Sequence, residues 1–217
     1  MKRDLRIVTK KIAIICLSVV LFANFHFSLN VYAAEAEYTN DKNWNRANAA
    51  AYANKWALKY NTKEYYKANY DCTNFVSQCL EKGGKKRSST LPDYYSTKHW
   101  RPHSATWENA NYFRKYWRAK VANTGKNIKN LSKKEKLAYA DKMYNKLYNG
   151  DVIQWGYSKT DTSHSQIVWG YDYDSKTSSD TLKLAQHTYN TRDLIIHDYI
   201  TTTNYTYVRY YQMIKKK

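Results

Sequence analysis

The chain has 217 residues and a formal net charge of +18, from 36 basic and 18 acidic residues. It contains only two prolines and six glycines, which excludes a collagen-like chain and argues against a disordered one. The 23 tyrosines and seven tryptophans supply bulky side chains for the core of one domain. The positive charge favours anionic partners, but the sign alone does not separate nucleic acid from cell-wall polymers or lipid headgroups.

The first 33 residues have the parts of a secretory signal peptide. A positive start precedes an apolar run over residues 12–25, and Val31-Tyr32-Ala33-Ala34 offers small residues for cleavage. The apolar run is too short for a comfortable membrane span, although a retained anchor is the alternative. We predict a signal peptide over residues 1–33 and a mature domain over residues 34–217 with no stable membrane span. Cleavage removes five basic residues and one acidic residue, which leaves +14.

The first half of the mature chain has helical spacing of its apolar residues. We predict four helices, over residues 43–60, 71–82, 107–122 and 133–148. Gly83-Gly84 ends the second helix, and Ser132 with Glu135 forms a capping box at the start of the fourth. Prolines and a Ser-Ser-Thr run interrupt residues 85–103, which are predicted to form a loop.

Beyond Gly150 the pattern changes to short β-branched or aromatic runs separated by polar residues. We predict five strands, over residues 152–155, 166–171, 182–188, 194–199 and 206–213. Helices followed by strands are typical of an α+β fold with an antiparallel sheet. Repeats and long linkers are absent from the sequence, so we predict one domain.

Two cysteines remain after cleavage, Cys72 and Cys79. Two helical turns separate them by roughly 10.5 Å of rise, which is too far for a disulfide, so we expect free thiols. Asp71 is a good N-cap, and Cys72 would then be the first helical residue, where the helix dipole favours a nucleophilic thiolate. The alternative is that Cys72 is a small buried side chain. For Cys79 we predict such a structural role in the core, because it shares a helix face with Phe75 and Val76.

A nucleophilic thiol needs a base, and His164 is the candidate because it starts a predicted strand directly after a polar turn. A polar group on the neighbouring strand would orient its ring, and His187 can fill that place. Taken alone, each histidine is more typical of a loop end or a satisfied core group. We expect no metal or other cofactor, because Pro102 breaks the one His pair with helical spacing, His99 and His103.

The run DCTNFVSQCL at residues 71–80 resembles the "putative amidase-domain" family, a branch of the papain-like cell-wall hydrolases that also includes the CHAP and NlpC types. The resemblance extends from Trp44 to about Asn190. Weaker matching pieces are Asn45-Arg46-Ala47, Gly150-Asp151-Val152-Ile153, the strand that follows His164, and Ala185-Gln186-His187-Thr188.

This resemblance implies a papain-like α+β fold with N-terminal helices packed on an antiparallel sheet. It implies Cys72 as nucleophile, His164 as base and His187 as the orienting third residue. Related families accept His, Asn or Gln at the third place, and Asn190 is close enough in sequence to compete. The resemblance also implies amide bonds of the peptidoglycan type as substrate.

We therefore predict a secreted, wall-associated, monomeric thiol amidase or peptidase. Its expected partner is peptidoglycan or another anionic cell-wall polymer, and not nucleic acid. The alternative is a non-catalytic wall-binding or toxin-like module, in which the basic, tyrosine-rich surface carries the function and Cys72 is structural. Rapid alkylation of Cys72 below the normal thiol pKa would distinguish the enzyme from the binding module.

Overall fold

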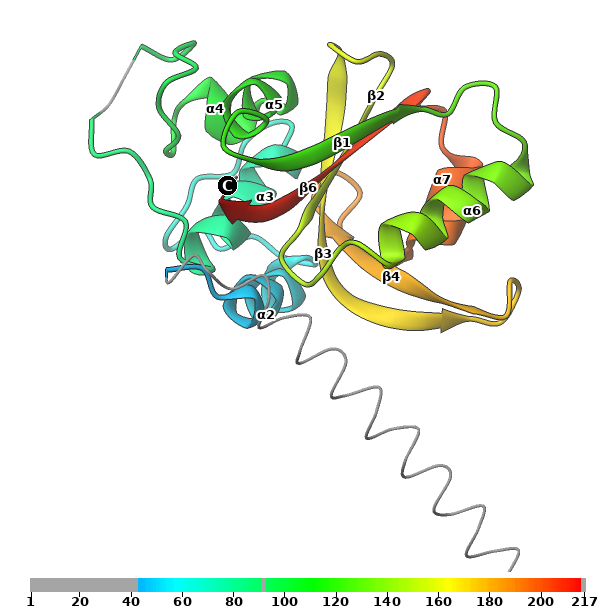
Figure 1. Cartoon of the computed structure of the whole chain (residues 1–217). Helices are drawn as coiled ribbons and strands as arrows, with labels where there is room; N and C mark the ends of the chain where they lie inside the picture. The colour runs from blue at the N-terminus through cyan, green and yellow to red at the C-terminus, as the bar shows by residue number, and fades with distance from the viewer. Residues whose placement is uncertain (1–42, 91–92, 216–217) are drawn as a thin grey trace, which may run out of the picture. The chain divides into compact units, whose positions relative to one another are not determined.

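The computed structural model describes residues 43–90 and 93–215 (Figure 1), so the predicted signal peptide lies outside the described residues. Four helices occupy the first part: α2 (Arg46–Trp56), α3 (Cys72–Lys82), α4 (Ala105–Glu108) and α5 (Ala110–Trp117). Asn45 caps α2 by accepting a hydrogen bond from the Asn48 N–H at 2.9 Å. Nine of the eleven residues of α3 are buried, because α2, α4 and the sheet pack around this helix.

Six strands form one antiparallel sheet in the order β1-β6-β2-β3-β4-β5. They are β1 (Val121–Asn127), β2 (Val152–Gly156), β3 (Thr162–Asp174), β4 (Ser179–Gln186), β5 (Thr191–Ile195) and β6 (Tyr207–Lys215). Two further helices complete the described part of the chain, α6 (Lys133–Tyr144) and α7 (Ile196–Thr202). None of the helices in the described ranges is long and apolar enough to cross a membrane.

The sheet separates two apolar clusters. Val152 and Ile167 pack with α2, α3 and α5, whereas their strand neighbours Ile153 and Val168 belong to the second cluster with α6 and α7. This alternation follows from the two-residue period of a strand. Figure 1 shows α2 to α5 on one side of the sheet and α6 with α7 on the other. The described chain is thus α+β, with N-terminal helices packed on an antiparallel sheet, as predicted.

Several predicted elements are confirmed, and two are wrong in part. Ser132 and Glu135 form the predicted capping box of α6. The helix expected over residues 107–122 is interrupted at Asn109, which has an extended backbone and caps α5 instead. Its last residues belong to β1. The strand expected over residues 194–199 becomes a helix from Ile196 onward.

Candidate active site

Cys72 is the first residue of α3 and is 5% exposed. The prediction that Asp71 caps this helix is wrong, because its backbone is helical and its side chain makes no cap hydrogen bond. Its Oδ1 instead accepts hydrogen bonds from the Ala68 N–H at 2.8 Å and from Asn74 Nδ2 at 2.7 Å, while Oδ2 pairs with His187. Cys72 still lies at the helix start, where backbone N–H groups have no partner within the helix.

His164, near the start of β3, interacts with the Cys72 thiol, and each of the two groups shifts the pKa of the other. Burial raises the pKa of Cys72, but the hydrogen bond and charge interaction with His164 outweigh it, helped by Thr73 and the backbone of Ser165, so the thiol pKa is lowered. Burial lowers the pKa of His164, but the interaction with Cys72 and the hydrogen bond to Gln186 raise it above its ordinary value. The two opposite shifts favour a thiolate beside an imidazolium.

The Nε2 atom of His164 contacts the side-chain amide of Gln186. The neighbours of Gln186 fix which end of that amide faces His164. The Trp155 indole can only donate, and it donates to Gln166 Oε1 at 2.7 Å. Gln166 therefore turns its amide N–H toward Gln186 Oε1, at 2.6 Å, while the Gln186 amide N–H donates to the Thr188 carbonyl at 2.9 Å. Gln186 Oε1 is thus an acceptor, and His164 Nε2 donates to it across 2.8 Å. In the neutral ring this assignment leaves the lone pair on Nδ1, the nitrogen available to Cys72.

The prediction that His187 orients His164 does not match this arrangement. His187 directly follows Gln186, the last residue of β4, and begins the turn after that strand. The Nδ1 of His187 pairs with Asp71, and its Nε2 donates to the Trp56 carbonyl at 2.9 Å. The amide of Gln186 is therefore the polar group beside His164, and the ring of His187 lies behind the site.

Asn190, the other candidate for the third residue, also lies elsewhere, since its Oδ1 accepts a hydrogen bond from the Tyr60 hydroxyl at 3.4 Å. The sequence analysis missed Gln186, although it directly precedes His187 and related families accept Gln at the third place.

A second polar chain, which the sequence analysis also missed, reaches Cys72 from inside the fold. The Tyr211 hydroxyl donates to Gln154 Oε1 at 2.7 Å, and Gln154 Nε2 donates to Ser165 Oγ at 2.9 Å. The hydroxyls of Ser165 and Thr73 are 2.9 Å apart, and Thr73 Oγ1 is 3.7 Å from the Cys72 sulfur. Because all four partners are buried, this chain fixes the surroundings of the thiol without water.

Cys72, His164 and Gln186 open into a cleft of about 860 Å³. Five tyrosines line it: Tyr70, Tyr157, Tyr189, Tyr199 and Tyr205. The rings of Tyr199 and Tyr205 both have their centroids 6.4 Å from that of His164. None of the described residues that line this cleft is Lys, Arg, Asp or Glu, although the protein as a whole is strongly basic. The basic side chains of residues 43–90 and 93–215 thus lie outside the cleft lining.

Groups of three or more His, Cys, Asp or Glu side chains able to hold a metal ion do not occur in residues 43–90 and 93–215. The second cysteine, Cys79, is fully buried in the core, where burial raises its pKa well above the ordinary value. Both cysteines are free, as predicted. Of the two, only Cys72 has a thiol in reach of an imidazole and an open cleft.

A buried thiol beside an oriented imidazole at the floor of a cleft defines a candidate hydrolase site. Residues 43–213 match the family described as "Putative amidase domain", and the chain belongs to this family. Membership supports a hydrolase that acts on amide bonds.

A curated relative also matches, the "Uncharacterized protein YjcM" of Bacillus subtilis (strain 168), with 37% identity over 94 residues. The match covers 41% of this chain and 21% of YjcM, so the chain spans about a fifth of the length of that relative. No solved structure matches the chain significantly.

Proposed function

We propose that the protein is a cysteine-dependent amide hydrolase of papain-like arrangement, with Cys72 as nucleophile, His164 as base and Gln186 as the residue that orients the base. The observation that carries this proposal is the position of His164 between the other two. Its Nε2 donates to Gln186 Oε1, whose orientation the indole of Trp155 fixes through Gln166, so in the neutral ring Nδ1 is the nitrogen left to take the thiol proton. An imidazole held in this tautomer can take the thiol proton without rearrangement.

The chemistry proceeds in two stages. The Cys72 thiolate attacks the amide carbonyl carbon, a C–S bond forms, and N–H groups at the start of α3 hold the developing oxyanion. His164 gives its Nδ1 proton to the leaving amine nitrogen as the C–N bond breaks, which leaves a thioester. Water then attacks the thioester carbonyl carbon, and His164 takes a proton from that water. The C–S bond breaks, which releases the carboxylic acid product and regenerates the Cys72 thiolate.

The substrate that we propose is an amide of peptidoglycan or of another anionic wall polymer, met by a secreted, monomeric protein after removal of its signal peptide. The family, the signal-like N-terminus and the net charge of +14 that remains after removal of residues 1–33 support this proposal. Since charged side chains are not among the described cleft residues, the anionic groups of the polymer would bind outside the cleft, while its scissile amide enters the cleft. Binding to isolated cell walls should therefore weaken steeply as salt rises, whereas hydrolysis of a small neutral amide should change little.

Digestion of purified peptidoglycan, followed by mass spectrometry of the released fragments, tests the reaction and identifies the bond. The Cys72→Ala variant should release no fragments and remain folded. The matched control is Cys79→Ala, which removes the other thiol and should keep its activity. Near-normal turnover by Cys72→Ala would exclude the thiol mechanism.

The pH dependence of alkylation tests the thiolate directly. Because the pKa of Cys72 is lowered, the thiolate should persist, and iodoacetamide should react quickly, below the ordinary thiol range. Because the pKa of His164 is raised, the imidazolium should persist to higher pH than usual. Hydrolysis should therefore decline on the acid side as Cys72 gains a proton and on the alkaline side as His164 loses one. A thiol that does not react would favour the non-catalytic wall-binding or toxin-like module.

A further inference from the structure

Helix α7 forms part of the wall of the cleft. Tyr199 of α7 packs on Trp155 with 4.9 Å between ring centroids and faces the ring of His164. The segment after α7 adds Tyr205, whose ring is nearly parallel to that of His164, at an interplanar angle of 7°. α7 has only seven residues, and so short a helix has little stability of its own. Contacts on its other side must therefore hold it in place.

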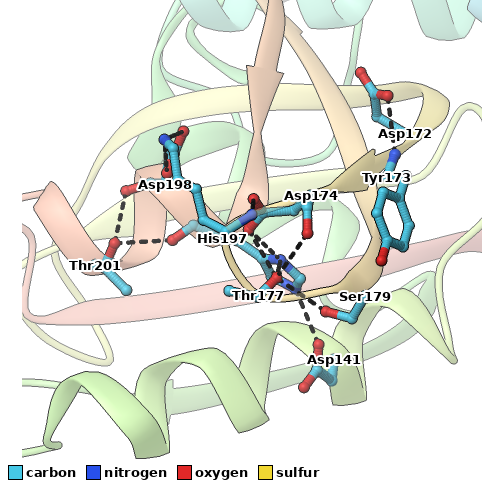
Figure 2. Close-up of polar contacts among 10 residues, drawn as sticks. Asp141, Asp172, Tyr173, Asp174, Thr177, Ser179, His197, Asp198 and Thr201 are labelled. Atoms are coloured by element: carbon cyan, nitrogen blue, oxygen red, sulfur yellow. Dashed lines mark hydrogen bonds and ion pairs between the residues drawn. The ribbon is translucent and has the colours of Figure 1, made fainter.

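The opposite side of α7 carries a buried histidine between two carboxylates (Figure 2). His197 is 1% exposed, and its Nδ1 lies 3.1 Å from Asp174 Oδ2 at the end of β3. Its Nε2 lies 2.9 Å from Asp141 Oδ1 on α6. The Thr177 hydroxyl is 3.2 Å from Nδ1. One side chain thus connects α7 to α6 and to β3, the strand that carries His164 near its other end.

The turn between β3 and β4 fixes Asp174 before it meets His197. The backbone N–H of Lys176 donates to Asp174 Oδ1 at 3.0 Å, and the Thr177 hydroxyl donates to Oδ2 at 2.8 Å. Burial raises the pKa of Asp174, but the hydrogen bonds from Thr177, Lys176 and His197 outweigh it and lower the pKa. Asp174 is therefore an oriented carboxylate, able to hold the ring of His197.

We propose that His197 is a positioning residue, which holds α7 through Asp174 and Asp141 so that Tyr199 and Tyr205 form a fixed wall for the substrate. The proposal rests on the proposed function in taking this cleft as the substrate site. The partners of His197 all lie away from Cys72, and Gln186 holds His164 independently. Loss of the anchor should therefore weaken substrate binding more than the chemical step.

The test compares His197→Ala with Asp198→Ala, a control on the same helix. The Asp198 side chain forms an exposed ion pair with Lys176 at 3.1 Å, and the backbone carbonyl that accepts hydrogen bonds from Thr201 and Thr202 is kept in the variant, so the kinetics should be unchanged. His197→Ala should raise KM about tenfold and change kcat by less than about threefold. Asp141→Ala, at the half-exposed end of the anchor, should raise KM in the same direction, and Asp141→Asn, which keeps an oxygen acceptor, should restore it.

Two further measurements separate this proposal from the proposed function. Hydrogen exchange of the α7 amides should speed up in His197→Ala, while the alkylation rate of Cys72 should stay as in the wild type. An unchanged KM in both His197→Ala and Asp141→Ala, or a loss in kcat with KM unchanged, would overturn the positioning role. If the wild-type protein hydrolysed no amide, the proposed function would be wrong. Hydrogen exchange tests the positioning role separately, because an unchanged exchange rate of the α7 amides in His197→Ala would refute that role whether or not the protein is a hydrolase.

Discussion

Replacing Gln186 with leucine tests the assignment of the third residue most directly. The substitution keeps the approximate size of the side chain and removes the oxygen that accepts hydrogen bonds from His164 and Gln166. The ring of His164 would lose the contact that fixes its tautomer and its angle toward Cys72. Because the substitution touches no reacting atom, its effect should appear in the rate of the chemical step.

The size of the effect follows from the bond that is lost. A hydrogen bond to a charged group contributes about 1.5–3 kcal/mol, and the base carries a positive charge when it protonates the leaving amine. Since each 1.36 kcal/mol changes a rate tenfold, kcat should fall roughly 10- to 150-fold in Gln186→Leu. Gln186→Glu keeps an acceptor oxygen toward His164 and should retain more activity than Gln186→Leu.

Steady-state hydrolysis of a fluorogenic amide gives kcat and KM for both variants, and thermal unfolding checks that they remain folded. The reasoning fails if a folded Gln186→Leu variant turns over within twofold of the wild type. It also fails if a folded His187→Ala variant loses more kcat than Gln186→Leu, because His187 would then act on the base after all.

Three further substitutions test the support of the site. His187→Ala removes the buried contact with the 3%-exposed Asp71 side chain and should lower the free energy of unfolding by about 1–3 kcal/mol, measured by urea denaturation. Arg46→Ala should cost more, about 3–5 kcal/mol, because the fully buried Asp151 loses its 2.7 Å ion pair. Cys79→Ala should cost about 1–2 kcal/mol through the cavity that it leaves and should keep full activity.

Much of the helical layer could be predicted, because its signals are local. The apolar spacing of α2, α3 and α6 and the capping box of α6 depend only on neighbouring residues. β1 could not be predicted, because its sequence, VANTGKN, has few β-branched residues and becomes a strand by pairing with β6. The run at residues 194–199 was ambiguous for the opposite reason. Ile196 and Ile200 are spaced as on a helix face, yet Ile195 and Ile196 are β-branched and Tyr199 is aromatic, which favours a strand.

The proposed nucleophile, Cys72, and the proposed base, His164, were candidates from the sequence, but the proposed third residue, Gln186, was not. The resemblance implied His187 by its position in the matching motif, whereas the structure has Gln186 beside His164. Gln186, the last residue of β4, lines the cleft, whereas His187 begins the following turn and contacts Asp71, and local sequence does not say which of two neighbours faces the cleft.

Two neighbouring residues also differ in this way at the start of α3, where Cys72 lines the cleft and Asp71 contacts His187 instead. Each of the two motifs thus supplies one side chain to the candidate site and one to its support. The two supporting residues, Asp71 and His187, are hydrogen-bonded to each other behind the site. This pair joins the start of α3 to the end of β4, the elements that hold Cys72 and Gln186 on the two ring nitrogens of His164. Because Asp71 contacts His187, the contact constrains the neighbours of both residues, Cys72 and Gln186. Asp71 and His187 therefore affect the position of the proposed catalytic groups although neither lines the cleft.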